Sequence, residues 1–362
     1  MRLGVEAALV DGMLVPGDVA IDDGLVTAVG LDGSGHGIAV PGFVDLQVNG
    51  FAGVDFLGAD ADAFATAGDA LLETGVTAYL PTLITSPERD LVNALRSVPE
   101  RPRGPRILGV HLEGPFLSPA RLGTHGLRAR RDPDAALLDR LLDAGPVTLM
   151  TLAPELPGAL DLVGLLLARG VTVSLGHTDA TAAEANAAFD RGVRAVTHVF
   201  NAMRPLAHRD PGIVGAALVH PGVVLQAIVD GVHLDPEIVR LLWAVGAGRL
   251  ALVTDATAGA ALGDGTYALG EIEITVTGDV VRREDGVLAG SALTMPQAIR
   301  NLVAAGVPLE QALEAASTVP ARVLGLPHLG RLFPGGPADV TVIDDRIEVV
   351  TAIVGGETRV AG

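Results

Sequence analysis

The 362-residue sequence contains no cysteine and no lysine. Without cysteine the chain cannot form disulfides or offer thiolate ligands to a metal, a composition typical of a reducing compartment. Because all 25 basic residues are arginine, Schiff-base catalysis is excluded, as is a carbamylated lysine bridging two metal ions. Aromatic residues make up only 3% of the chain, so alanine, valine and leucine must fill most of the interior.

Positive charge is also scarce. The 25 basic residues stand against 43 acidic ones, so the formal net charge is −18. Such a surface repels a phosphate backbone, so we expect no nucleic-acid partner. No apolar run approaches the roughly 18 residues that a membrane helix needs, and residues 1–10 lack the pattern of a signal peptide. We therefore expect a cytoplasmic protein without a membrane partner. An anionic ligand would need a local basic pocket set against the overall charge.

The two ends of the chain share one pattern, in which short apolar runs alternate with turns. Residues 1–40 contain Asp-Gly turns at 11–12 and 23–24, and residues 330–362 contain two runs rich in β-branched residues. Neither end has enough strands to be stable alone. The pattern predicts one small β-sandwich built from both ends.

Between the ends, short strand-like runs alternate with Ala/Leu-rich helical stretches. Eight such units in residues 41–329 predict an α/β fold, a (β/α)8 TIM barrel, with an additional hairpin-like insert near residues 263–285. No glycine-rich nucleotide fingerprint opens the first unit, which disfavours an open doubly wound sheet. The predicted barrel strands cover residues 44–48, 77–83, 107–113, 147–152, 171–175, 195–199, 223–229 and 250–254.

Reactive side chains fall at the carboxyl ends of these strands, where TIM barrels carry their chemistry. Glu113, His177 and His198 are suitable ligands for a divalent transition metal, and three protein ligands leave a position open for water. Taken singly, a histidine at a strand end can also be a hydrogen-bonded structural group. His111 lies deeper on its strand, so we expect it to support the site without binding metal, and Glu155 is ambiguous.

Asp255 follows the eighth predicted strand and is the candidate acid/base. A carboxylate beside an activated water can take its proton and pass it to a leaving amine. Such a group typically raises the reaction rate about 10²–10⁴-fold. The alternative is a structural Asx turn or helix N-cap in the Thr-Asp-Ala-Thr segment.

Eight segments resemble N-acetylglucosamine-6-phosphate deacetylases of the amidohydrolase superfamily. One of them reads His-Leu-Glu-Gly-Pro-Phe, from residue 111 to residue 116. The segments occur in order through nearly the whole predicted barrel, and the β-rich ends also fit the resemblance. They cover residues 41–50, 111–116, 123–125, 175–178, 197–203, 230–233, 253–256 and 288–295.

The resemblance implies hydrolysis of the acetamide of N-acetylglucosamine 6-phosphate to glucosamine 6-phosphate and acetate. It implies the metal ligands named above, Asp255 as base and then acid, and His125 as the group that polarises the acetamide carbonyl. Arg209 and His233 are implied to bind the phosphate, with the arginine supplied across a homodimer interface. The substrate-binding residues implied by the resemblance are His125, Asn201, Ala202, Arg209, His233, Leu288, Ala289 and Gly290.

Many amidohydrolases carry His-x-His at the end of the first strand to hold a second metal. This sequence has Gln47 and Asn49 there, and neutral amides bind zinc poorly. We therefore expect one divalent ion per subunit, Zn²⁺ before Fe²⁺. Two other functions stay open. One is a deacetylase of a related N-acyl substrate such as N-acetylgalactosamine 6-phosphate, and the other is a non-catalytic protein that binds amino-sugar phosphates.

Overall fold

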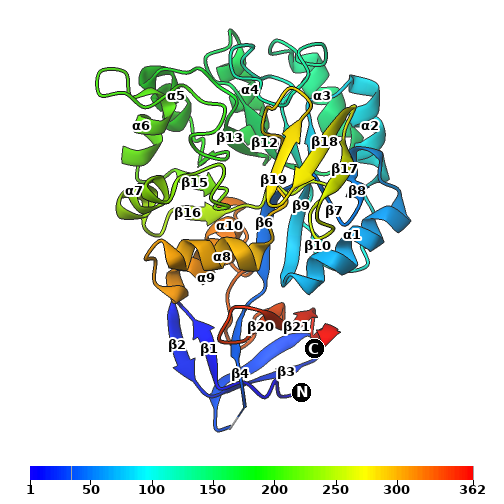
Figure 1. The fold of residues 1–362 in the computed structure, drawn as a ribbon, viewed down its shortest axis with the longest axis vertical. Helices are drawn as coiled ribbons and strands as arrows, with labels where there is room; N and C mark the ends of the chain where they lie inside the picture. Colours follow the sequence, from blue (N-terminus) through cyan, green and yellow to red (C-terminus); the bar gives the residue numbers. More distant parts are fainter. Residues whose placement is uncertain (34, 362) are drawn as a thin grey trace.

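The computed structural model describes residues 1–33 and 35–361 (Figure 1). Its centre is a parallel barrel whose neighbouring strands follow the chain order. Closure comes from the end of the first strand, where Val48 pairs with Ala256 and the Asp255 amide donates to the Gln47 carbonyl over 2.9 Å. The TIM-barrel prediction is confirmed. The barrel strands are β6 (Phe43–Val48), β9 (Val76–Ile84), β11 (Val110–Glu113), β12 (Val147–Leu152), β13 (Thr172–Leu175), β14 (Ala195–Val196), β15 (Val224–Ala227) and β16 (Leu250–Leu252).

Most barrel strands are buried along their whole length, because helices cover the outer face and side chains fill the inside. The helices begin at the residues that the sequence favours. Asp60 caps the first helix, and Thr181 and Glu184 form a capping box at the fifth. The helices are η1 (Phe56–Gly58), α1 (Ala61–Glu73), α2 (Glu88–Ser97), α3 (Ala135–Ala144), α4 (Ala159–Ala168), α5 (Ala182–Asp190), α6 (Gly212–Val219), α7 (Pro236–Gly246), α8 (Met295–Ala304), α9 (Leu309–Ala316) and α10 (Thr318–Val323).

Both ends of the chain meet below the barrel (Figure 1). They form a six-stranded sheet in the order β2-β1-β5-β20-β21-β22, and β3 pairs with β4 beside it. Val5, Val26, Val340 and Ile353 share one apolar cluster between these strands. The strands are β1 (Ala7–Val10), β2 (Met13–Pro16), β3 (Asp18–Asp22), β4 (Leu25–Leu31), β5 (Ile38–Pro41), β20 (Val340–Ile343), β21 (Val349–Val354) and β22 (Glu357–Ala361).

The division into residues 1–40 plus 330–362 and residues 41–329 stays a prediction. Residues 34 and 362 of the predicted terminal unit lie outside the described part. Strand β5 runs on to Pro41, one residue past the predicted boundary. A two-hydrogen-bond ion pair joins the terminal sheet to the barrel, since Arg106 donates to Asp339 over 2.7 and 3.1 Å.

The predicted insert near residues 263–285 has one strand more than a hairpin. It is a three-stranded antiparallel sheet in the order β17-β18-β19. Leu269, Ile274 and Val281 pack against Ile84 at the end of β9, so the insert lies beside the mouth of the barrel. Among the described residues, no helix combines the length and the apolar character that crossing a membrane requires. The remaining strands are β7 (Gly50–Phe51), β8 (Val54–Asp55), β10 (Arg106–Ile107), β17 (Gly265–Leu269), β18 (Ile272–Thr277) and β19 (Val280–Arg283).

Candidate active site

The barrel brings the predicted strand-end residues together at one mouth. Glu113 is the last residue of β11, and His177 and His198 lie two residues beyond β13 and β14. His177, His198 and Asp255 have φ values of 48°, 30° and 51°. Residues other than glycine rarely adopt this left-handed region, which costs roughly 1–3 kcal/mol each and is concentrated at functional sites. The side chains of all three residues line the same cavity at the barrel mouth.

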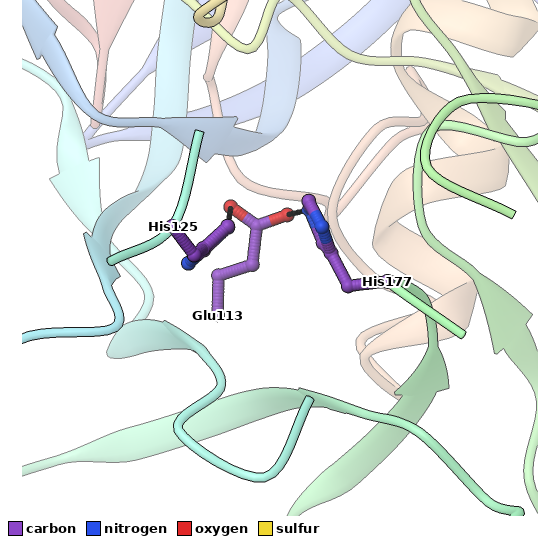
Figure 2. Close-up of side chains that lie close together, drawn as sticks. All are labelled: Glu113, His125 and His177. Atoms are coloured by element: carbon purple, nitrogen blue, oxygen red, sulfur yellow. Dashed lines mark hydrogen bonds and ion pairs between the residues drawn. The ribbon is translucent and has the colours of Figure 1, made fainter. Parts of the chain in front are cut away.

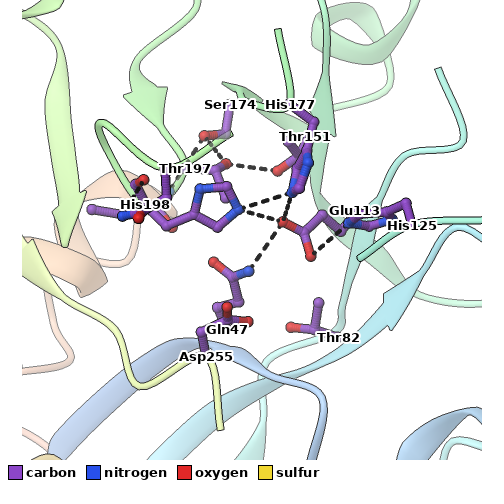
Figure 3. Close-up of polar contacts among 12 residues, drawn as sticks. Gln47, Thr82, Glu113, His125, Thr151, Ser174, His177, Thr197, His198 and Asp255 are labelled. Carbon is purple, nitrogen blue, oxygen red and sulfur yellow. Dashed lines mark hydrogen bonds and ion pairs between the residues drawn. The ribbon is translucent and has the colours of Figure 1, made fainter. Parts of the chain in front are cut away.

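Glu113 lies at the centre of a compact polar cluster (Figures 2 and 3). Its Oε1 atom lies 2.8 Å from His198 Nε2 and 3.1 Å from His177 Nε2, and the two nitrogens are 3.0 Å apart. His125 Nε2 lies 3.6 Å from Oε2 on the other side of the carboxylate. Ligand atoms of Glu113, His125 and His177 all lie within 4.8 Å of one another, so the cluster could hold a metal ion.

The hydrogen bonds made by Nδ1 distinguish His177 from His125. His177 Nδ1 lies 3.0 Å from the Arg121 carbonyl oxygen, which can only accept, so Nδ1 carries the proton and the neutral ring leaves Nε2 free to bind a metal. His125 Nδ1 lies 3.2 Å from the Thr85 backbone N–H, which can only donate. In the neutral His125 ring, Nε2 therefore carries the proton and is a hydrogen-bond donor.

Burial and mutual charge shift the acidities of the cluster. Burial lowers the pKa of His177 to about 4, so its ring is neutral at ordinary pH. Burial alone would raise the pKa of Glu113, but its contacts with His125, His177 and His198 hold that pKa well below its ordinary value. Burial and then the Glu113 charge raise the pKa of Asp255 to about 6. One site therefore contains an ionised carboxylate and a second carboxylate that is easier to protonate.

These residues line a cavity of about 390 Å³, a size within the range of small-molecule sites. Several buried polar atoms around it have no hydrogen-bond partner among the described residues, including His198 Nδ1, His125 Nε2 and Asn49 Oδ1. Buried polar atoms are normally paired, so this concentration is typical of a site that receives a ligand. The predicted site residues that line the cavity are Glu113, His125, His177, His198, Asn201, Ala202, His233, Asp255, Leu288 and Gly290.

Two predicted residues lie elsewhere. Ala289 is fully buried in the apolar cluster beneath the insert, with Ile84 and Leu269, and it does not line the cavity. The neighbouring positions 288 and 290 point to the cavity while this alanine packs behind it. Arg209 is exposed on the segment between β14 and α6 and also lies outside the cavity of its own chain.

His111, which was not expected to bind metal, and Glu155, whose role was ambiguous, both contact neighbouring residues of the barrel. His111 lies on β11 two residues before Glu113, and its Nε2 is 2.7 Å from Thr151 Oγ1 and its Nδ1 is 3.3 Å from Thr82 Oγ1. Glu155 accepts from the Thr178 hydroxyl and from the Asp179 backbone N–H. Both therefore support neighbouring segments of the barrel mouth.

Sequence reasoning missed three contacts at the site. Arg121 supplies the carbonyl that fixes the His177 ring, and Gln47 and Asn49 donate to Glu113 and Asp255 over 3.1 and 2.7 Å. The motif around residues 41–50 drew attention to the two amides, but nothing in the sequence pairs them with carboxylates on distant strands.

A metal-compatible cluster at the carboxyl end of a (β/α)8 barrel defines the class of protein, that of the metal-dependent barrel hydrolases. Comparison with known proteins agrees, since residues 38–359 match the model of the amidohydrolase family. The chain belongs to the amidohydrolase family, and its relatives include N-acetylglucosamine-6-phosphate deacetylases.

The chain is 40% identical over 341 residues to the N-acetylglucosamine-6-phosphate deacetylase of Rattus norvegicus, covering 89% of this chain and 83% of the rat protein. It is 35% identical over 360 residues to the N-acetylgalactosamine-6-phosphate deacetylase of Escherichia coli O157:H7, covering 96% of each. Among solved structures, a mutant N-acetyl-D-glucosamine-6-phosphate deacetylase of Mycobacterium smegmatis in complex with N-acetyl-D-glucosamine-6-phosphate superposes with a TM-score of 0.95. That pair shares 37% identity and covers 100% of this chain and 99% of the other.

Proposed function

We propose that this protein hydrolyses the acetamide of N-acetylglucosamine 6-phosphate and releases acetate and glucosamine 6-phosphate. The observation that carries the proposal is one cavity holding both a Glu-His-His cluster and a buried carboxylate, Asp255, whose pKa is raised to about 6. The similarity to deacetylases over most of the chain supports the same reaction. A protein that only binds the sugar would need neither a metal-type cluster nor an acid/base beside it.

The residues present fit a divalent metal ion. Glu113, His177 and His198 would hold it, because their three ligand-type atoms converge within 3.1 Å and the His177 tautomer presents Nε2 without a proton. His125 does not fit as a ligand, because its Nε2 carries the proton. A bound ion supplies Lewis acidity, which lowers the pKa of water and polarises a carbonyl oxygen. We propose one Zn²⁺ per chain, with Fe²⁺ as the alternative.

Asp255 performs the two proton transfers. In its ionised form it takes a proton from the attacking water, whose oxygen bonds to the acetyl carbon. The carbon–nitrogen bond then breaks as protonated Asp255 returns that proton to the sugar nitrogen, because an amine leaves only when protonated. His125 donates from Nε2 to the oxygen on which negative charge develops, and its position is fixed by the Thr85 backbone N–H.

The phosphate would be bound beside His233. His233 lines the cavity with its Nδ1 2.6 Å from Asp230 Oδ2, and this contact orients the ring. Asn201 and Ala202 would contact the sugar or its phosphate. We propose that Arg209 reaches the same phosphate from the partner chain of a homodimer, since it is exposed and lies outside the cavity of its own chain.

A second candidate substrate is N-acetylgalactosamine 6-phosphate, because the similar Escherichia coli relative carries that name. Both substrates present the same acetamide and phosphate, and they differ only at the C4 hydroxyl. The test is acetate release from both phosphosugars under identical conditions. We expect the higher kcat/KM with the gluco substrate. A higher kcat/KM with the galacto epimer would make N-acetylgalactosamine 6-phosphate the preferred substrate. We also propose a cytoplasmic location, which fits a chain without cysteine.

A further inference from the structure

Gln47 in β6 and Asn49 just after this strand carry amide side chains that the reaction described so far does not use. Gln47 Nε2 donates to Glu113 Oε1 over 3.1 Å, and Asn49 Nδ2 donates to Asp255 Oδ1 over 2.7 Å. Each amide is thus paired with one of the two carboxylates of the site. Gln47 is fully buried and Asn49 is 2% exposed, so water does not screen these bonds.

The orientation of the Asn49 amide is determined by its partners. Nδ2 also lies 3.4 Å from the Asp255 carbonyl oxygen, so both groups in front of it are acceptors. Rotating the amide by 180° would place its oxygen against an ionised carboxylate oxygen and a carbonyl, which is repulsive. The Asn49 backbone N–H donates to the Ala256 carbonyl over 2.8 Å, which ties the two strand ends together on either side of Asp255.

The two oxygens of Asp255 are therefore not equivalent. Oδ1 accepts from Asn49, whereas Oδ2 has no hydrogen bond with the described residues, and Asp255 lines the cavity. A carboxylate with a rotating side chain would present either oxygen to the reacting water. Here one oxygen is occupied and the backbone is held in the left-handed region, at φ 51°.

We infer that Asn49 is a positioning residue of the proposed hydrolysis: its amide N–H holds Oδ1 of Asp255 and leaves Oδ2 as the oxygen that takes and returns the proton. The inference rests on the proposed function, because Asp255 must be the acid/base for its orientation to matter. Catalytic groups must be held in a productive geometry by neighbouring hydrogen bonds. Asn49 acts through Asp255, so its loss should lower kcat without changing substrate affinity.

The competing explanation is that Asn49 only fills space at the barrel mouth. Two substitutions separate the explanations. Asn49→Asp keeps the shape but replaces the donor with a second negative oxygen facing Asp255, whereas Asn49→Leu keeps a similar volume and removes the donor without adding charge. A space-filling role predicts that the isosteric aspartate is the milder change. A donor role predicts that the aspartate is as harmful as leucine or worse.

The matched control is Gln226→Leu. Gln226 is a fully buried amide of the same barrel, and its Oε1 also has no partner among the described residues. Its Nε2 contacts the Ser174 hydroxyl over 3.4 Å and not a carboxylate. This variant therefore measures the cost of removing a buried barrel amide that does not contact Asp255.

The experiment measures kcat, KM and bound metal for the wild type and the three variants with N-acetylglucosamine 6-phosphate. We expect Asn49→Leu to lower kcat about ten- to hundredfold, the size of one charge-assisted hydrogen bond. We expect Asn49→Asp to lower kcat at least as much, with KM within about twofold and metal content unchanged in both. Gln226→Leu should keep kcat within about twofold.

Near-wild-type kcat in Asn49→Asp would overturn the inference, because shape alone would then suffice. It would also be overturned if Asn49→Leu raised KM or lost metal while kcat at full metal occupancy stayed unchanged. If the wild type itself released no acetate from the phosphosugar, the proposed function would fail instead. The two failures are therefore distinguishable in one set of assays.

Discussion

His125 and His177 face each other edge to face, with ring centroids 4.3 Å apart, yet their hydrogen bonds impose opposite tautomers. The Arg121 carbonyl requires a proton on Nδ1 of His177, whereas the Thr85 N–H requires a bare Nδ1 on His125. One neutral ring therefore presents a lone pair to the centre of the site and the other presents an N–H. Backbone contacts alone therefore suit His177 to the proposed role of metal ligand and His125 to the proposed role of oxyanion donor.

This relationship predicts which histidines hold metal. His177→Ala and His198→Ala should each lose most of the bound ion after dialysis, because each removes one of the three proposed ligands. His125→Ala should keep about one equivalent while kcat falls about 10²–10³-fold, the usual cost of one oxyanion donor. Metal analysis of the dialysed variants checks this. Loss of metal from His125→Ala with retention in His198→Ala would reverse the two roles.

Replacement of the proposed acid/base, Asp255, gives a second prediction. The Asp255→Asn side chain keeps the shape of aspartate and can still accept the hydrogen bond from Asn49, but it cannot take a proton. We expect kcat to fall by about 10²–10⁴-fold or more, with bound metal unchanged. Acetate release measured beside metal content tests this expectation. A variant with near-normal kcat would remove Asp255 from the proton transfers.

The phosphate site is tested by Arg209→Ala. A charge-assisted hydrogen bond is worth roughly 1.5–3 kcal/mol, so KM for the phosphosugar should rise about tenfold or more. KM for unphosphorylated N-acetylglucosamine should change little. His208→Ala is the matched control, because that residue is the exposed neighbour of Arg209. Equal effects on both sugars would mean that Arg209 has a structural role, and a monomer in sedimentation analysis would exclude its supply by a partner chain.

A buried carboxyl beneath the site predicts how stability depends on pH. Burial raises the pKa of Asp45 to about 7, against hydrogen bonds from Thr254 and from the Gln47 N–H that lower it. The ionised form is therefore disfavoured in the folded state. The free energy of unfolding should fall as pH rises from about 4, near the unfolded pKa, to about 7, by about 1.4 kcal/mol for each unit of pKa difference.

Asp45→Asn provides the comparison for that prediction. Its amide resembles the protonated acid, since Nδ2 can donate to the Thr254 hydroxyl where Asp45 Oδ2 now lies 2.6 Å away. The wild type should lose stability relative to this variant between pH 4 and pH 7, and the difference should stay constant above pH 7. Urea unfolding of both proteins across this range measures it. A difference independent of pH would show that Asp45 does not titrate there.

The barrel could be predicted because the alternation of strand-like runs and helical stretches repeats eight times along the sequence. All eight predicted barrel strands overlap observed ones, and β11 begins later than predicted because a separate short strand, β10, takes residues 106–107. Glu113, His177 and His198 could be found because strand ends converge in any closed parallel barrel. The terminal sheet was also foreseeable, since neither end could bury its strands alone.

The other features of the site could not be predicted from the sequence, because they depend on contacts between distant parts of the chain. Asn49 and Asp255 are 206 positions apart, and their pairing follows from the closure of the barrel between β6 and β16. The histidine tautomers are set by backbone groups of loops whose paths no periodicity predicts. Ala289 was expected at the cavity, but the third strand of the insert places it in an apolar cluster instead.

The most direct test of the account is acetate release by metal-analysed protein, comparing N-acetylglucosamine 6-phosphate with N-acetylglucosamine. We expect strong preference for the phosphosugar at about one metal ion per chain, and loss of turnover when a chelator removes the ion. Absence of turnover on either sugar by metal-loaded protein would contradict the proposed substrate, and full activity without metal would contradict the proposed role of Glu113, His177 and His198.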